Sequence, residues 1–192
     1  MSEKFLETIK IKDGSAHHLA YHQKRVDAAI GRGVLDLAAI IEPPKDQLYR
    51  CRIVYDAKDY EVQYLPYQKR QIKTLKLVFD DTLEYEKKYA NREAIDHLFV
   101  QREGCDDILI VQEGYITDTS IANVAFYDGD HWLTPNKPLL RGTTRQRLLD
   151  EGKIIAKDIH YKEIKNFQKI ALMNAMIDFA IIAQDNIEEV IC

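Results

Sequence analysis

The stretch ITDTSIANVAF, residues 116–126, sets short polar side chains between two runs typical of β-strands. It opens on Ile116 and returns to apolar residues at 124–126. The polar residues between them are Thr117, Asp118, Thr119, Ser120 and Asn123. No Gly or Pro is present to mark an ordinary turn. What these side chains serve depends on the segments around them.

The segments around this stretch predict hairpins and a short helix. Residues 106–118 read as two strands that turn at Glu113-Gly114, and residues 123–135 as two strands that turn at Asp128-Gly129. Residues 143–152 predict a helix, with Gly152 in the usual place just past its end. A strand, a short helix and a further strand are expected within residues 153–177.

The first half of the chain predicts a small mixed sheet with one or two helices. Side chains alternate along residues 5–11, so the residues on one side of a strand are Phe5, Glu7, Ile9 and Ile11. A turn at Asp13-Gly14 follows. The remaining elements are a helix within residues 20–34, strands at 48–56, 60–68 and 74–81, and a charged, helix-prone segment at 84–103.

A boundary near residue 83 divides the chain into two lobes. The first is a small N-terminal α/β lobe, residues 1–83, and the second is a larger C-terminal lobe, residues 84–192. A chain of 192 residues with 46% hydrophobic content suits one globular unit or two small lobes. The expected fold class is therefore α/β (α+β), with mixed sheets and packed helices.

Composition argues against several classes of protein. The net charge is -4 and the basic residues are scattered, which disfavours a nucleic-acid surface. No apolar run approaches the roughly 20 residues of a membrane helix, and the N-terminal segment shows no signal peptide, so we expect a cytoplasmic protein. Cys51, Cys105 and Cys192 lack zinc-like spacing, so we expect reduced thiols, no metal site and no role for Cys192.

Some residues suggest chemistry, although each has an ordinary alternative. Gly142, followed by Thr143 and Thr144 at a helix start, could expose backbone N–H groups to an anion. A threonine could equally be a simple helix cap. Lys87 or Lys88 could be a nucleophile if it is partly desolvated, or a solvated surface charge if it is not.

Four further residues leave the same choice open. His22 and Arg25 are three apart on a predicted helix, so they share one side of it as a site or as a surface pair. Asp118 is either a turn former or a buried carboxylate. Asn174 interrupts an apolar run and needs partners if it is buried, either in a site or in a structural network.

The order of these residues carries more information than any one of them. The elements in question are Lys88, Asp118, Gly142-Thr143-Thr144 and Asn174. The motifs around them are FLETIKIKDG with YHQKR, KYANR, residues 106–126, TPNKPLLRGTTRQRLL and IALMNAM. Together they resemble the fold-type IV pyridoxal-phosphate enzymes, or class IV aminotransferase family, which includes the D-amino acid and branched-chain aminotransferases and 4-amino-4-deoxychorismate lyase. The resemblance covers most of the chain.

The resemblance implies a two-lobed D-amino acid aminotransferase-like fold, pyridoxal 5'-phosphate as cofactor and a homodimer. Lys88 would form a Schiff base with the cofactor aldehyde and would then move a proton on the substrate. Asp118 would pair with the pyridine nitrogen, and Arg25 would clamp the phosphate. The other residues implied are Thr143 and Thr144, through their backbone N–H groups, Gly142 before them, Asn174 and Ala175 in a closing loop, and Asn123 and Ser120 as supporting residues.

Three features differ from the usual pattern of this family. The family has Glu at the position of Asp118, and Asp reaches roughly 1.5 Å less far. The strand and loop that usually precede the ETI element are shortened. Asn91-Arg92 is similar to the lyase branch, whereas many aminotransferases have Asn-Tyr. Arg92 would meet a substrate carboxylate or the phenolic oxygen of the cofactor, or it would lie on a helix surface.

These features leave three functional hypotheses. The first is a lyase that converts 4-amino-4-deoxychorismate to 4-aminobenzoate and pyruvate. The second is an aminotransferase that acts on a small amino acid and a 2-oxo acid. The third is a cofactor-free binding protein on the same fold, for which Lys88 would be dispensable.

Overall fold

The computed structural model describes residues 3–184 and 187–192, which form two compact units. Unit 1 comprises Met1–Lys69 and Lys87–Asn91, and unit 2 comprises Arg70–Glu86 and Arg92–Cys192. Each unit has its own sheet and its own apolar core. The mixed α/β fold expected from the sequence is confirmed.

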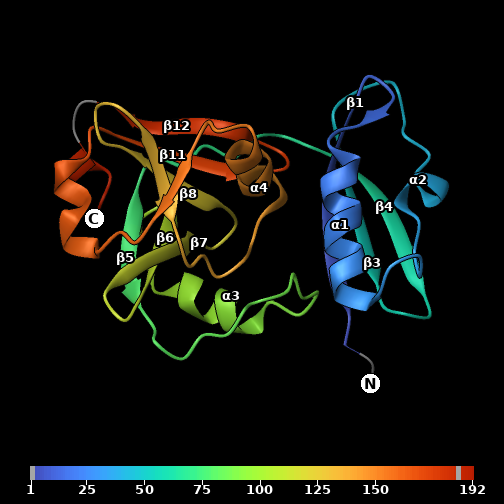
Figure 1. Ribbon diagram of the computed structural model, residues 1–192, viewed down its shortest axis with the longest axis horizontal. Helices are drawn as coiled ribbons and strands as arrows, with labels where there is room; N and C mark the ends of the chain where they lie inside the picture. The colour runs from blue at the N-terminus through green and yellow to red at the C-terminus, as the bar shows by residue number, and fades with distance from the viewer. Residues whose placement is uncertain (1–2, 185–186) are drawn as a thin grey trace. The chain divides into compact units, whose positions relative to one another are not determined.

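Unit 1 is an antiparallel sheet with the strand order β2-β1-β3-β4 (Figure 1). Its elements are β1 (Phe5–Lys12), β2 (Ser15–Ala16), α1 (Leu19–Ile30), α2 (Leu37–Ile40), β3 (Tyr49–Tyr55) and β4 (Tyr60–Pro66). The predicted turn between β1 and β2 has positive φ at both Asp13 and Gly14, as the tightest hairpins require. Helix α1 packs on β1 and buries Val26 completely.

The inward row of β1 contains the side chains that the alternation predicts. Phe5, Ile9 and Ile11 are buried and belong to the core of unit 1. Glu7 occupies the same row and is also fully buried. A carboxylate in such a row requires charged partners, because an unpaired charge is costly to bury.

The segment Lys87–Asn91 belongs to unit 1 because it pairs with β1. The backbone N–H of Leu6 donates to the carbonyl of Lys88 at 2.8 Å, and that of Ala90 donates to the carbonyl of Lys4 at 2.8 Å. The aromatic ring of Tyr89 also lies against Phe5, with ring centroids 5.8 Å apart. The units differ from the predicted lobes, 1–83 and 84–192, in two places: residues 70–83, with the strand expected at 74–81, belong to unit 2, and Lys87–Asn91 belongs to unit 1.

Unit 2 contains a longer mixed sheet with the order β10-β9-β8-β7-β6-β5, and β11 pairs with both β8 and β12. The strands are β5 (Leu75–Phe79), β6 (Asp107–Gln112), β7 (Tyr115–Thr119), β8 (Asn123–Tyr127), β9 (Trp132–Pro135), β10 (Ile155–Lys157), β11 (Lys169–Asn174) and β12 (Asp178–Gln184). Strands β5 and β6 are parallel, as are β9 and β10, and the other pairs are antiparallel. The stretch 116–126 thus supplies two neighbouring strands and the turn between them.

Four helical segments accompany this sheet in the part of unit 2 that the structure describes. They are α3 (Glu93–Val100), α4 (Thr143–Asp150), η1 (Tyr161–Asn166) and η2 (Ile187–Glu189). The prediction for α4 is confirmed, including Gly152 with a φ of 66° just beyond its end. The helical tendency of residues 84–103 is realised only over α3, because Lys87–Asn91 pairs with β1 instead.

The cysteines differ from the expectation of reduced thiols. Cys105 and Cys192 form a disulfide, with Cα atoms 6.7 Å apart. The end of the chain is brought there by β5, since the backbone N–H of Cys192 donates to the carbonyl of Leu75 at 3.0 Å. The expectation that Cys192 has no role is therefore wrong. Cys51, buried in unit 1, is a free thiol.

Within the described part of the chain, no helix is long and apolar enough to cross a bilayer.

Candidate active site

In unit 1, the predicted phosphate ligand Arg25 is held by a buried carboxylate. Its Nε and Nη2 atoms donate to Glu7 at 2.7 and 2.6 Å, and His22 Nδ1 lies 2.5 Å from the same carboxylate. Burial alone would raise the pKa of Glu7, but Arg25 and His22 outweigh it and hold the pKa at about 2. His22 and Arg25 are therefore not a surface pair, because Glu7 on β1 binds both.

The two candidate lysines have different surroundings. The ammonium group of Lys87 lies over the ring of Phe5, 5.2 Å from its centroid, and the residue is exposed. Lys88 is half-buried, and its carbonyl accepts the hydrogen bond from Leu6. Strand β1 therefore fixes the backbone of Lys88 while Glu7, one residue further along, holds Arg25.

In unit 2, Asp118 on β7 is buried. Of the two alternatives that the sequence left open, a turn former and a buried carboxylate, the second is therefore correct. Its Oδ1 accepts from Asn123 Nδ2 at 2.6 Å, and its Oδ2 accepts from the backbone N–H of Leu140 at 2.9 Å. Asn123 Nδ2 also donates to the carbonyl of Leu140 at 2.8 Å. The opening strand of the 116–126 stretch, its closing strand and the loop before α4 therefore meet at one carboxylate.

Burial raises the pKa of Asp118 to about 7, although the Leu140 N–H, Asn123 and the positive charge of Arg145 all favour the ionised form. Arg145 is itself buried, and its guanidinium donates to the carbonyl of Pro135 at 2.8 Å. Asp118 is thus poised to gain or lose a proton near neutral pH. A nearby cation that compensates its burial would keep it ionised.

Helix α4 begins beside this carboxylate. Gly142 is its N-cap residue and has no side chain to cap the first turn, while Thr143 and Thr144 follow as buried residues. The alternative that a threonine caps the helix is therefore wrong. An added Cβ at Gly142 would lie 2.0 Å from Asn123 Oδ1. Glycine is thus needed for close packing, since its φ of -64° suits any residue.

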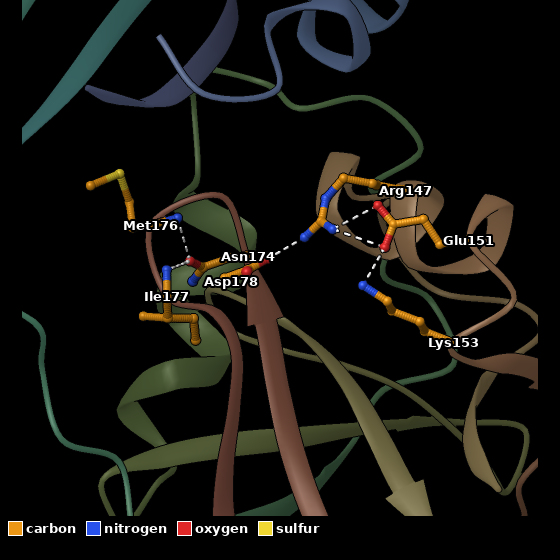
Figure 2. A network of polar contacts seen from close by, with 7 residues as sticks. All are labelled: Arg147, Glu151, Lys153, Asn174, Met176, Ile177 and Asp178. Atoms are coloured by element: carbon orange, nitrogen blue, oxygen red, sulfur yellow. Dashed lines mark hydrogen bonds and ion pairs between the residues drawn. The ribbon is translucent and has the colours of Figure 1, made fainter. Parts of the chain in front are cut away.

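The hairpin tip between β11 and β12 contains the predicted loop residues Asn174 and Ala175. Asn174 Oδ1 accepts from the backbone N–H groups of Met176 at 2.9 Å and Ile177 at 3.0 Å (Figure 2). Its Nδ2 donates to the carbonyl of Ile121 at 3.2 Å, in the turn between β7 and β8. Asn174 therefore shapes the loop around Ala175 and ties it to the 116–126 stretch.

A residue that the sequence did not single out, Arg147, links α4 to the same hairpin. Its guanidinium contacts Glu151 at 2.9 Å on one side and Asp178 at the start of β12 on the other (Figure 2). Lys153 adds a second cation to Glu151 at 2.8 Å. The helix contains two buried arginines, Arg145 and Arg147, but the partner Asp178 lies too far along the chain to be inferred from the sequence.

Arg92 occupies a position between the alternatives that the sequence left open. One Nη atom donates to the carbonyl of Ser120 at 2.9 Å, and Nε lies 3.7 Å from Asp96 one turn further along α3. The residue is half-buried rather than fully exposed. It therefore anchors the start of α3 to the 116–126 stretch.

The predicted site residues thus form one group in each unit. Unit 1 holds Arg25, bound by Glu7, and Lys88 on the neighbouring backbone. Unit 2 brings the remaining ones onto connected elements, namely Asp118, Asn123, Gly142, Thr143, Thr144, Asn174, Ala175 and Arg92. Glu7, which binds both Arg25 and His22 in unit 1, was not among the predicted site residues, although a charge in the inward row of β1 was a signal for it.

The packing of Gly142 on Asn123 predicts a coupled effect on stability. Gly142→Ala should lower the free energy of unfolding by about 1–3 kcal/mol, the usual cost of overpacking a filled site. In an Asn123→Ala background the space is open, so the same substitution should cost much less. Urea unfolding of the wild type, both single variants and the double variant measures this, and additive effects would contradict the packing argument.

The raised pKa of Asp118 predicts a pH-dependent stability of the cofactor-free protein. Between the ordinary aspartate pKa of 3.8 and about 7, the folded chain binds a proton that the unfolded chain has lost. Stability is therefore lost as the pH rises through this window, by about 1.4 kcal/mol per pKa unit at most.

Asp118→Asn should remove this loss, so its Tm relative to the wild type should increase between pH 5 and pH 8. Asp128→Asn is the control, because hydrogen bonds from the backbone N–H groups of His131 and Asp130 lower the pKa of Asp128 and move its transition below this range. A Tm difference for Asp118→Asn that does not change with pH would contradict a pKa of about 7 for this carboxylate in the folded chain.

Comparison with known proteins identifies relatives of the chain. Residues 54–184 match the model of the family "Amino-transferase class IV". An uncharacterised protein of Haemophilus influenzae is 39% identical over 180 residues, which cover 88% of this chain and 96% of the relative.

Two solved structures are similar to the chain. A "putative 4-amino-4-deoxychorismate lyase" from Haemophilus somnus has a TM-score of 0.85 and 37% identity, with 92% of this chain and 97% of the other covered. A hypothetical aminotransferase from Mycobacterium tuberculosis in its PLP-bound form has a TM-score of 0.73 and 17% identity over 95% and 81% of the chains, a likeness of fold. The chain therefore belongs to the class IV amino-transferase family of enzymes.

Proposed function

We propose that the chain is a pyridoxal-phosphate-dependent lyase that converts 4-amino-4-deoxychorismate to 4-aminobenzoate and pyruvate. The cofactor assignment is carried by the buried carboxylate of Asp118, whose pKa is raised to about 7 by burial and which lies one side chain away from an uncapped helix N-terminus. The lyase assignment is supported by the Haemophilus somnus protein, which is 37% identical over nearly the whole of both chains. Asn91-Arg92, similar to the lyase branch, agrees with it.

The residues present have the chemical properties that pyridoxal phosphate requires. Free N–H groups at the start of a helix bind phosphate, and Gly142 leaves the first turn of α4 without a side-chain cap. A protonated pyridine nitrogen would be the cation that keeps the buried Asp118 ionised. When it is bound, the cofactor withdraws electrons from the α-carbon of an amino substrate.

The chain would then supply binding and proton transfer. Arg25 and the backbone N–H groups of Thr143 and Thr144 would bind the phosphate, and Asp118 would keep the proton on the ring nitrogen. Lys88 would hold the cofactor through its amine and, once displaced by the substrate amine, would remove the α-proton. Loss of that proton, with cleavage of the bond between the ring and the enolpyruvyl oxygen, would make the ring aromatic, which drives the reaction. The enolpyruvate that leaves would take up a proton to give pyruvate, and Lys88 would displace the product amine to release 4-aminobenzoate.

Substrate and assembly complete the proposal. Arg92 would bind a substrate carboxylate from its position at the start of α3, where the carbonyl of Ser120 orients it. Asn174 would act by shaping the loop that contains Ala175, because its amide is hydrogen-bonded within the hairpin tip. We further propose a cytoplasmic homodimer, as is typical of the family, and sedimentation analysis of the purified protein tests the dimer.

The role of Lys88 predicts a spectroscopic difference between two neighbouring lysines. Wild-type protein mixed with pyridoxal phosphate should show a yellow absorption band that survives desalting and is bleached by borohydride. Lys88→Ala should lack this band and lose at least about 100-fold in turnover. Lys87→Ala is the matched control and should keep both, since Lys87 lies over Phe5. A stable band in Lys88→Ala would refute the assignment.

The reaction type predicts which products form. Wild-type enzyme supplied with 4-amino-4-deoxychorismate alone should release pyruvate and 4-aminobenzoate in equal amounts, which a lactate dehydrogenase assay and fluorescence detect. Turnover that requires an added 2-oxo acid would instead indicate an aminotransferase. A third outcome is a protein that gains the yellow band but turns over nothing, with or without an added 2-oxo acid. That result would contradict both reactions while leaving the cofactor assignment intact.

A further inference from the structure

The buried carboxylate of Glu7 has no assigned role in the chemistry. It is fully enclosed in unit 1, in the row of β1 that otherwise contributes apolar side chains to the core. An apolar residue would fill such a position at lower cost, because a buried charge must be compensated by partners. Its partners are therefore the best guide to its purpose.

Glu7 holds one edge of the Arg25 guanidinium. Arg25 Nε lies 2.7 Å from Oε1, and Arg25 Nη2 lies 2.6 Å from Oε2. Such a two-pronged contact fixes the plane of the guanidinium group as well as its position. His22 Nδ1, 2.5 Å from Oε2, holds the carboxylate from a third direction.

The local fold makes this arrangement rigid. Helix α1 supplies both His22 and Arg25, three residues apart and on the side that faces β1. Glu7 and His22 are almost completely buried, whereas the Arg25 side chain remains 16% exposed. Glu7 therefore holds one edge of the Arg25 guanidinium in the core. Of these three side chains, Arg25 is the most exposed to solvent.

Charge and orientation predict opposite consequences of this contact. The negative charge of Glu7 partly cancels the positive charge of Arg25. On charge alone, removal of Glu7 would therefore strengthen the binding of an anion. If Glu7 serves to orient the guanidinium, its removal would instead weaken binding, because an Arg25 side chain that Glu7 no longer holds has more conformations to lose. The sign of the effect therefore distinguishes the two.

We propose that Glu7 is a positioning residue, which orients Arg25 to bind the phosphate group of the cofactor, and that His22 secures it. The inference rests on the proposed function, in which Arg25 is a phosphate ligand. Because the neighbouring residue Leu6 also binds the backbone of Lys88, β1 sets the places of both the phosphate ligand and the proposed Schiff-base lysine.

The test compares two aldehydes that differ only in the phosphate. Dissociation constants for pyridoxal phosphate and pyridoxal are measured by absorbance on the wild type and on Glu7→Gln. The ratio of the two constants reports the contribution of the phosphate alone. Glu7→Gln should reduce the preference for the phosphorylated form by about 10- to 100-fold, as expected for partners that orient a ligand group, while pyridoxal binding should be nearly unchanged.

A variant of Arg25 shows whether Glu7 acts through that residue. Arg25→Met should lower the phosphate preference by itself, and adding Glu7→Gln to it should lower the preference no further. This double variant also leaves no unpaired charge in the core. A preference that is unchanged or larger in Glu7→Gln, or an effect that persists in the Arg25→Met background, would overturn the inference.

Two more variants complete the set. Glu7→Asp keeps the charge but withdraws the carboxylate by one methylene, and it should show the same fall in preference, so the test remains decisive if Glu7→Gln does not fold. Glu61→Gln removes an exposed carboxylate from β4 and should change neither constant. If the wild type itself binds neither aldehyde through a lysine, the proposed function fails. If it binds pyridoxal phosphate and Glu7→Gln behaves like the wild type, only this inference fails.

Discussion

The hydrogen bonds between β1 and the segment Lys87–Asn91 are the constraint on which the organisation of unit 1 depends. They attach a distant part of the chain to the strand that carries Glu7, through the contact of Leu6 N–H with the Lys88 carbonyl. One strand thereby fixes the backbone of Lys88 and the side chain of Arg25. Pairing with β1 fixes the main chain from which the Lys88 side chain extends, which reduces the conformational freedom that the proposed Schiff-base lysine would otherwise have to lose.

In unit 2, close packing holds the Asp118 carboxylate and the start of α4 in place. Asp118 is buried where its ionised form is disfavoured, and its orientation is maintained by Asn123 and the backbone of Leu140. Asn123 in turn leaves room for nothing larger than Gly142 at the start of α4. The carboxylate and the helix N-terminus are thus held through a single amide. The stability lost by burying Asp118 is the kind of local cost that functional sites commonly carry.

The sequence predicted the features that depend on short-range signals. The turns at Asp13-Gly14 and Asp128-Gly129 and the helix end at Gly152 follow from the backbone preferences of the residues themselves. The alternation in β1 placed Glu7 in the buried row. The order of motifs indicated the family, which the match over residues 54–184 confirms.

Features that depend on contacts between distant segments were not predictable in this way. Nothing local to Lys88 indicates that its backbone pairs with β1, and the helical tendency of residues 84–103 is realised only over α3 for the same reason. The disulfide of Cys105 and Cys192 and the contact of Arg147 with Asp178 also join remote positions. The roles of Lys88 and Asp118 in binding the cofactor remain proposals, supported by the properties of their surroundings.

The most direct test of this account is to locate the cofactor on the chain. Protein incubated with pyridoxal phosphate is reduced with borohydride, digested, and analysed by mass spectrometry for the phosphopyridoxyl group. We predict one modified residue, Lys88, with its neighbour Lys87 unmodified, because Lys88 is half-buried and its carbonyl accepts a hydrogen bond from β1, whereas Lys87 is exposed. Modification at Lys87, or spread over exposed lysines, would contradict it.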